Sequence, residues 1–219
     1  MSIEIVHVLI ILYRGNLMTR KSGRPPKGKS TIDSRQKIID TTIELIQSKG
    51  AGFITVRNVC QAADLSIGTF YHYFRDKDDL MMYFISETSF EDCKLKTDIH
   101  DIADRICELY MILIDRYLQL GESFMKSFYS TDNKSLSAYM GERDGSFPEN
   151  TVMARSEKEM LAAQEAGVIS RDADAHEICA DICTIVKGCV FEWCLNDAAL
   201  DIRATLRRII RSYLQCYTS

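Results

Sequence analysis

The 219-residue sequence lacks the short motifs by which several large enzyme classes are recognised. It has no glycine-rich phosphate-binding loop, no G-x-S-x-G nucleophile turn and no H-E-x-x-H zinc signature. Histidine, a frequent general acid or base, occurs at only four positions, which are 7, 72, 100 and 176. We therefore expect a protein that is not an enzyme and that needs no cofactor.

Long apolar runs are also missing. The N-terminal stretch Ile3 to Tyr13 is apolar but spans only about 11 residues, whereas a helix that crosses a bilayer needs about 20. No basic region precedes this stretch and no small-residue cleavage site follows it, so we expect neither a signal peptide nor a membrane partner. We expect translation to start at Met18, and detection of Met1 by intact-mass analysis of the native protein would contradict this.

Cysteines are present, but not in the pattern of a disulfide framework. The eight cysteines are scattered through apolar stretches, at positions 60, 93, 107, 179, 183, 189, 194 and 216. This scatter favours a reducing cytoplasm, where we expect the protein to reside. His176, Cys179 and Cys183 share one helical face and suggest a metal or redox site. Because no C-x-x-C motif and no fourth ligand are evident, we expect buried cysteines and no metal.

Acidic residues are scarce in the first third of the chain. Residues 20–77 carry eleven Lys or Arg against five Asp or Glu, a net charge of +6, whereas residues 78–219 have a net charge of −10. A basic head on an acidic body meets phosphates at one end only, so the overall charge of −4 does not exclude a nucleic-acid binder.

The segment Thr19 to Ser30 reads TRKSGRPPKGKS and has no apolar periodicity, which predicts a flexible arm. Such an arm follows a phosphate backbone or enters a minor groove, and the alternative is a solubilising tail. Its basic residues are Arg20, Lys21, Arg24, Lys27 and Lys29.

The outline of a helix-turn-helix follows the arm. A first helix begins at Asp33, with Gln36 as a capping-box partner, and ends at Lys49-Gly50. Thr55 is a good N-cap for a short second helix, and Asp64 stands where a tight turn requires a left-handed conformation. Ser66 caps a third helix. Three apolar residues anchor this helix to the first two, and they are Leu65, Phe70 and Phe74.

The segment Ile38 to Leu80 resembles the head of the TetR/AcrR family. The most specific parts are Thr55-Val56-Arg57, Ala63-Asp64-Leu65-Ser66 and the run GTFYHYF at 68–74, followed by Lys77. The resemblance implies a homodimer of all-helical subunits, in which the last two long helices dimerise. We therefore expect an all-α fold of about nine helices: an N-terminal extension and arm at 1–31, a DNA-binding domain at 32–92, and an effector-binding and dimerisation domain at 93–219.

Side-chain chemistry and the resemblance together predict ten DNA contacts. Hydroxyls and backbone N–H groups at helix starts position phosphates, whereas the recognition helix reads base edges and its aromatic residues clasp the backbone. The predicted contacts are Thr55, Arg57, Ser66, Ile67, Gly68, Thr69, Tyr71, His72, Tyr73 and Lys77. Ile67 departs from the long polar residue common in the family. It either reads a thymine methyl or contributes little.

The rest of the chain reads as helices. Asp76 caps a fourth helix that continues to about Lys94, and further helices span about 99–120, 122–130, 150–166, 173–196 and 199–217. The stretch from Asn133 to Pro148 is expected to separate two of them. Met, Phe and Tyr are abundant between 81 and 153, which suits either an effector pocket or an ordinary core. The predicted pocket residues are Tyr83, Phe84, Tyr110, Met111, Tyr117, Phe124 and Phe128.

The segment 173–196 has an apolar surface broader than one core face requires, which favours a dimer interface with the following helix. The predicted interface residues are Ile178, Ile182, Ile185, Cys189, Trp193, Leu206 and Ile210. We expect a regulator, most simply a repressor, that a small-molecule effector releases from a palindromic double-stranded operator. The alternative is a helical interaction protein that retains the head without specific DNA binding.

Overall fold

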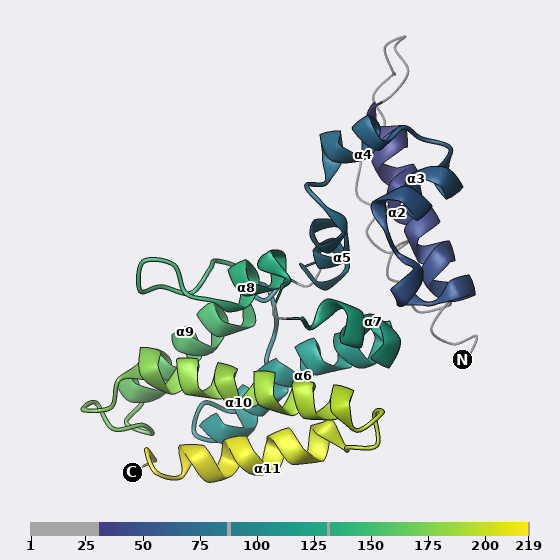
Figure 1. Cartoon of the computed structure of the whole chain (residues 1–219). Helices are drawn as coiled ribbons and strands as arrows, with labels where there is room; N and C mark the ends of the chain where they lie inside the picture. The colour runs from purple at the N-terminus through teal and green to yellow at the C-terminus, as the bar shows by residue number, and fades with distance from the viewer. Residues whose placement is uncertain (1–30, 87–88, 131, 219) are drawn as a thin grey trace.

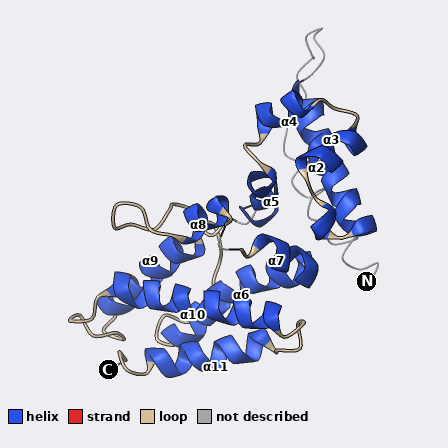
Figure 2. Ribbon diagram, in the orientation of Figure 1, coloured by secondary structure: helices blue, strands red, loops and turns tan. Residues whose placement is uncertain are grey.

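The computed structural model of the chain describes residues 31–86, 89–130 and 132–218. Within these ranges the protein forms ten α-helices and one short 3-10 helix, and its extended contacts amount to isolated bridges outside any strand (Figure 2). The all-α prediction is confirmed. None of the described helices combines the length and hydropathy needed to cross a bilayer. The basic arm and the predicted start at Met18 lie outside the described residues.

The head consists of α2 (Thr31–Lys49), the 3-10 helix η2 (Ala51–Phe53), α3 (Val56–Ala63) and α4 (Ile67–Tyr73), which contact one another (Figure 1). Helix α2 already contains Asp33, so the predicted N-cap at Asp33 was wrong. Gln36 Nε2 donates to Asp40 Oδ1 at 2.9 Å, one turn toward the C-terminus. Gly50 ends the helix with a φ of 82°, a backbone conformation that residues with a side chain rarely adopt.

Helix α5 (Lys77–Ser86) leads from the head toward the body, and Asp76 caps it by accepting a hydrogen bond from Asp79 N at 2.8 Å. The helix ends at Ser86, so the expected continuation to Lys94 was wrong. The reason is that the following amides bind side chains: Phe90 N donates to Asn150 Oδ1 at 3.1 Å, and Lys96 N donates to Glu108 Oε1 at 2.9 Å. These bonds compete with the helical pattern.

The body contains α6 (Ile102–Leu120), α7 (Glu122–Phe128), α8 (Lys134–Met140), α9 (Val152–Glu165), α10 (Ala175–Leu195) and α11 (Ile202–Leu214). Helix α6 contacts α7, α9 and α11, and α10 packs on α9 and α11. Helices α10 and α11 lie at the end of the molecule away from the head (Figure 1).

Helix α8 was not predicted, because the stretch from 133 to 148 was interpreted as a separator. Asn133 is nonetheless a good N-cap, since its Oδ1 accepts from Leu136 N at 2.9 Å, and Leu136 and Met140 are buried. The cap followed three residues later by a leucine is the signal that was available in the sequence.

Several contacts join the head and α5 to the body. The 3-10 helix η2 packs on α7, and α5 packs on α8. Arg116, buried on α6, donates from Nε to the Phe84 carbonyl of α5 at 2.8 Å. The path from α5 into the body therefore runs through α6 and α8.

Candidate nucleic-acid interface

The short helix α3 is fixed at its start by side-chain hydrogen bonds. Thr55 Oγ1 accepts from Asn58 N at 3.1 Å, which confirms Thr55 as the N-cap, and Asn58 Nδ2 donates to the Phe53 carbonyl at 2.8 Å. The role of Asn58 was missed, although its place three residues after the cap is a usable signal. Arg57 projects from this helix and is exposed.

The turn between α3 and α4 is built on Asp64, whose φ of 49° and ψ of 51° are left-handed, as predicted. Leu65 N donates to the Cys60 carbonyl at 3.0 Å and closes the end of α3. The turn places α4 against α2 and α3 at a fixed angle. This is the helix-turn-helix arrangement.

Helix α4 separates a buried face from an exposed one. Ser66 caps it, since Ser66 Oγ accepts from Thr69 N at 3.0 Å. Phe70 and Phe74 are buried in the head core, as predicted, whereas Ile67 and Tyr71 remain 51% and 55% exposed. Large apolar side chains on an outer face one turn apart point to a surface that something else contacts.

Gly68 lies between these exposed residues. A Cβ added at Gly68 meets only Ser66 Oγ, at 3.7 Å, so the fold of the chain itself does not require glycine there. A side chain would instead thicken the outer surface of α4. The missing side chain therefore permits a close approach from outside.

All ten residues predicted for DNA contact are exposed or half-buried, and none belongs to the core. Those on α3 and α4 come from the two adjoining helices of the head, at the far end from α10 and α11 (Figure 1). Lys77 stands at the start of α5, with its Nζ 3.4 Å from Asp78 Oδ1. Whether each residue touches DNA stays a prediction.

Comparison with known proteins agrees with this geometry. A family model described as "Bacterial regulatory proteins, tetR family" matches residues 38–83, from α2 into α5. An HTH-type transcriptional regulator of Staphylococcus aureus is 27% identical over 114 residues, which cover 49% of this chain and 54% of that protein. The head of the chain is therefore similar to the head of TetR-family regulators. The match to the Staphylococcus aureus regulator spans about half the length of that protein.

Solved TetR-family structures extend the likeness to the body. A TetR transcriptional regulator from Agrobacterium tumefaciens has a TM-score of 0.54 at 18% identity, covering 85% of this chain and 95% of that one. Thermus thermophilus FadR, a TetR-family repressor in complex with lauroyl-CoA, has a TM-score of 0.57 at 16% identity, covering 82% and 93%. At these identities the likeness shows the fold, a helical head on a helical body.

The residues predicted for the effector pocket lie mostly in the core. Tyr83 and Met111 are half-buried, and Met111 lines a surface cleft between α6 and α11. The other five are buried by their own chain, and they are Phe84, Tyr110, Tyr117, Phe124 and Phe128. Burial suits an effector pocket and an ordinary core equally, so the assignment of these residues to a pocket stays a prediction.

The predicted dimer interface requires a larger correction. Ile185 is half-buried, but the other six side chains are at most 8% exposed within one subunit, and they are Ile178, Ile182, Cys189, Trp193, Leu206 and Ile210. A partner subunit cannot cover surface that is already covered, so the prediction was wrong for these six. The apolar side chains that α10 leaves exposed are Phe191 at 54% and Leu195 at 60%.

His176 does not join Cys179 and Cys183 in a polar cluster. Its Nδ1 lies 2.7 Å from Glu157 Oε1 on α9, its Nε2 lies 3.5 Å from Glu142 Oε2, and its ring stacks on Phe147 at 4.4 Å. Burial raises the pKa of the Cys179 thiol to about 12, so this thiol stays protonated at neutral pH. The histidine thus joins α10 to α9 and to the loop after α8.

Protonated His176 is expected to stabilise the fold. The hydrogen bond to Glu157 raises the pKa of His176 above its usual value, with Glu142 contributing in the same direction and burial opposing it. A raised pKa adds stability that is fully present below the unfolded-state pKa of about 6.5 and is lost as pH rises through the folded-state pKa. Urea unfolding from pH 5.5 to 8.5 is expected to show a larger loss of stability in the wild type than in His176→Gln.

Glu157→Gln removes the carboxylate that lies 2.7 Å from His176 Nδ1 and should flatten the pH profile in the same way. Parallel pH profiles for the wild type and His176→Gln would contradict the role assigned to His176.

Proposed function

We propose that the chain is a DNA-binding transcriptional regulator, a repressor that leaves a palindromic operator when a small-molecule effector binds its body. The observation that carries the proposal is the outer face of α4, where Ile67 and Tyr71 are exposed beside the side-chain-free surface of Gly68. An α-helix with such a face fits the major groove, where Ile67 meets a thymine methyl and Tyr71 a backbone phosphate.

The distribution of charge along the chain supports a complex in which the head faces the DNA and the body faces away from it. The net charge of +6 over residues 20–77 attracts phosphates, while the net charge of −10 over residues 78–219 keeps the body away from them. The arm residues from Arg20 to Lys29 then supply backbone or minor-groove contacts beside the head.

Dimerisation is part of the proposal, with an interface different from the one expected from the sequence. Phe191 and Leu195 are one turn apart on α10 and both are more than half exposed. Burying these side chains against a second copy of the chain gives a symmetric interface on α10. Two heads then meet half-sites about 34–36 Å apart, or near a multiple of that spacing.

Effector release is proposed from the helical body that this chain shares in fold with ligand-bound regulators. The Thermus thermophilus FadR structure holds lauroyl-CoA, so a body of this fold accommodates a small molecule. Release of operator DNA requires that the effector bind the DNA-free arrangement more tightly than the DNA-bound one.

The substitution Tyr71→Ala tests the DNA-binding proposal. Loss of one groove-edge contact costs about 1–3 kcal/mol, which corresponds to roughly 5- to 150-fold weaker operator binding. Because Tyr71 is 55% exposed, the free energy of unfolding should change by only about 0.5 kcal/mol. Gel shifts with the region upstream of the gene, over a range of salt concentrations, measure the affinity.

The matched control is Leu161→Ala, which removes a 49% exposed apolar side chain from α9 of the body and should leave operator affinity unchanged. A wild-type protein that forms no specific complex at any salt concentration would instead favour the interaction-protein alternative. Wild-type affinity in Tyr71→Ala would remove Tyr71 from the interface.

A further inference from the structure

Four tyrosine hydroxyls meet inside the body without hydrogen-bond partners among the described residues. They belong to Tyr110 and Tyr117 on α6, Tyr129 at the end of α7 and Tyr139 on α8. Tyr110 and Tyr117 are 0% and 1% exposed. Ser156 lies beside Tyr110, and its hydroxyl donates to the Met153 carbonyl at 3.2 Å. Buried polar groups in native proteins are almost always paired, so four such groups together call for an explanation.

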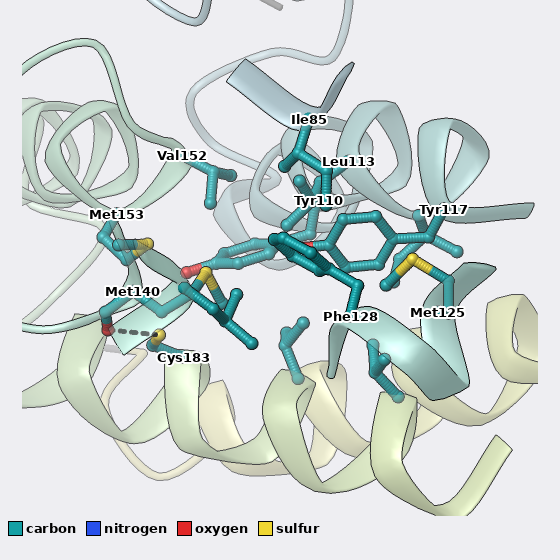
Figure 3. Close-up of a cluster of buried hydrophobic side chains, with 14 of the residues drawn as sticks. Ile85, Tyr110, Leu113, Tyr117, Met125, Phe128, Met140, Val152, Met153 and Cys183 are labelled. Atoms are coloured by element: carbon teal, nitrogen blue, oxygen red, sulfur yellow. Dashed lines mark hydrogen bonds between the residues drawn. The ribbon is translucent and has the colours of Figure 1, made fainter. Parts of the chain in front are cut away.

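The four side chains form one cluster. The ring centroids of Tyr117 and Tyr129 are 6.5 Å apart. The pKa of Tyr117 is raised by burial and also by its three tyrosine neighbours, which are Tyr129, Tyr139 and Tyr110. Figure 3 shows Tyr110 and Tyr117 lying together among Met125, Phe128 and Met140. The surroundings of the hydroxyls are thus sulfur, aromatic and aliphatic groups, which favour a neutral and adaptable site.

The hydroxyls remain protonated in this setting. Burial raises the pKa of Tyr139 to about 12, and the pKa values of the other three are raised in the same direction by burial first and by neighbouring ionisable groups second. At neutral pH each hydroxyl is therefore an uncharged group with one hydrogen to donate and lone pairs to accept.

A cavity of about 590 Å³ lies between α8 and α10 and reaches this cluster. Tyr129 and Met140 belong both to the cluster and to the cavity wall. Its volume falls in the range of small-molecule sites. Among the described residues of its lining, Lys187 alone bears a formal charge; the others are Ser130, Leu136, Ser137, Gly141, Thr184, Gly188 and Phe191.

We propose that this cavity binds an uncharged molecule with a broad apolar body. The molecule enters past Met140, and its carbonyl, ether or hydroxyl groups form hydrogen bonds with the hydroxyls of Tyr117 and the three neighbouring tyrosines. The inference rests on the proposed function, in which this molecule is the effector. A cation brought against the methionines and aromatic rings would lose its hydration without gaining a counter-charge, because the charged side chain of the described lining, Lys187, is itself positive.

The position of α8 connects this site to the head. Leu136, Ser137 and Met140 of α8 line the cavity, and the same helix packs on α5. A molecule that displaces Met140 to reach the tyrosines therefore acts on the helix that supports α5. Arg116 of α6 holds α5 from another side through its hydrogen bond to the Phe84 carbonyl. A shift of α8 therefore changes the orientation of α5 relative to α6.

The experiment uses the full chain and the neutral dye Nile red, which carries a carbonyl acceptor and fluoresces in apolar surroundings. Fluorescence titration gives a dissociation constant for the wild type and for Tyr117→Phe. Removing the hydroxyl keeps the ring, so we expect about fivefold weaker binding, the effect of one lost hydrogen bond. The melting temperature should stay equal or rise, because the free protein loses an unpaired buried group.

The matched control is Tyr213→Phe, which removes a hydroxyl that donates to Asp181 Oδ2 at 2.6 Å on the α10–α11 side of the body. Its melting temperature should fall while its affinity for Nile red stays that of the wild type. The cationic dye ethidium should bind at least tenfold more weakly than Nile red, because the cavity offers it no carboxylate among its described lining residues.

Equal Nile red affinities in the wild type and Tyr117→Phe, or equal affinities for the two dyes, would overturn the inference. Operator binding measured without dye is a separate readout. If the protein does not bind operator but the dye site depends on Tyr117, the proposed function is overturned and the ligand class stands. If the protein binds operator but dye affinity does not depend on Tyr117, the ligand class is overturned and the proposed function stands.

Discussion

Replacing Glu159 with leucine is expected to lower the free energy of unfolding by about 3–5 kcal/mol, because it leaves two largely buried guanidinium groups without their carboxylate. Glu159 Oε2 accepts from Arg105 Nε at 2.7 Å and Glu159 Oε1 accepts from Arg155 Nε at 2.8 Å. The Glu159 side chain is 8% exposed and each arginine side chain is 18% exposed. Water therefore reaches the two guanidinium groups poorly and would stabilise their charges only weakly once the carboxylate is removed.

The same three side chains hold the segment between α5 and α6 in place. Arg155 Nη1 donates to the Glu91 carbonyl at 2.7 Å, and Arg105 Nη1 donates to the Thr97 carbonyl. Glu159 orients both guanidinium groups for these bonds. Its loss is therefore expected to loosen the connection from head to body as well as to lower global stability.

Urea unfolding followed by circular dichroism measures the effect, with Glu165→Leu as the control on the exposed side of the same helix. The control should change stability by about 0.5 kcal/mol or less. The triple variant Arg105→Met, Arg155→Met, Glu159→Leu should recover much of the loss, because it removes the buried charges together. A stability of Glu159→Leu equal to that of the control would contradict the assigned role.

The pH dependence of this cluster has a definite sign. Burial would raise the pKa of Glu159, but the hydrogen bonds from Arg105 and Arg155 outweigh it and lower the pKa below the usual value. A lowered pKa contributes stability that is present above the unfolded-state pKa and is lost as pH falls through the folded-state pKa. Acid should therefore weaken the wild type more than Glu159→Leu.

The head could be predicted from the sequence because local chemistry determines it. Thr55 and Ser66 cap their own helices, and Asp64 adopts the left-handed turn, all within a few residues of chain. Such interactions are readable wherever they occur. The end of α5 was missed because longer-range partners decide it, as Asn150 and Glu108 do for the segment after Ser86.

The body was predicted as a set of helices but not as a set of sites. The broad apolar surface of α10 is real, yet α9 and α11 both pack on it, so width alone does not reveal a dimer face. Similarly, the tyrosines of the candidate ligand site look like core residues in the sequence. The folded structure is needed to show that Tyr117 and Tyr129 lie together with unpaired hydroxyls, because their proximity depends on how α6, α7 and α8 pack.

The substitution Phe70→Ala should unfold the helix-turn-helix more effectively than any change on its surface. Phe70 is 0% exposed, and its ring packs against Phe74 at a centroid distance of 5.7 Å. Truncating a buried phenylalanine to alanine costs about 3–5 kcal/mol. Helix α4 has only 7 residues, too few to persist without this anchor, so the recognition face should be lost with it.

Comparison of Phe70→Ala with Tyr71→Ala separates folding of the head from recognition by the head. These neighbouring aromatics face opposite ways, since Tyr71 is 55% exposed. Both variants should lose operator affinity, but only Phe70→Ala should lose stability in urea unfolding and helical signal in circular dichroism. Nile red should still bind Phe70→Ala, because the tyrosine cluster lies in the body, among α6, α7 and α8. Operator binding by Phe70→Ala at wild-type affinity would mean that α4 does not depend on its buried face, and the assignment of α4 as the recognition helix would then be wrong.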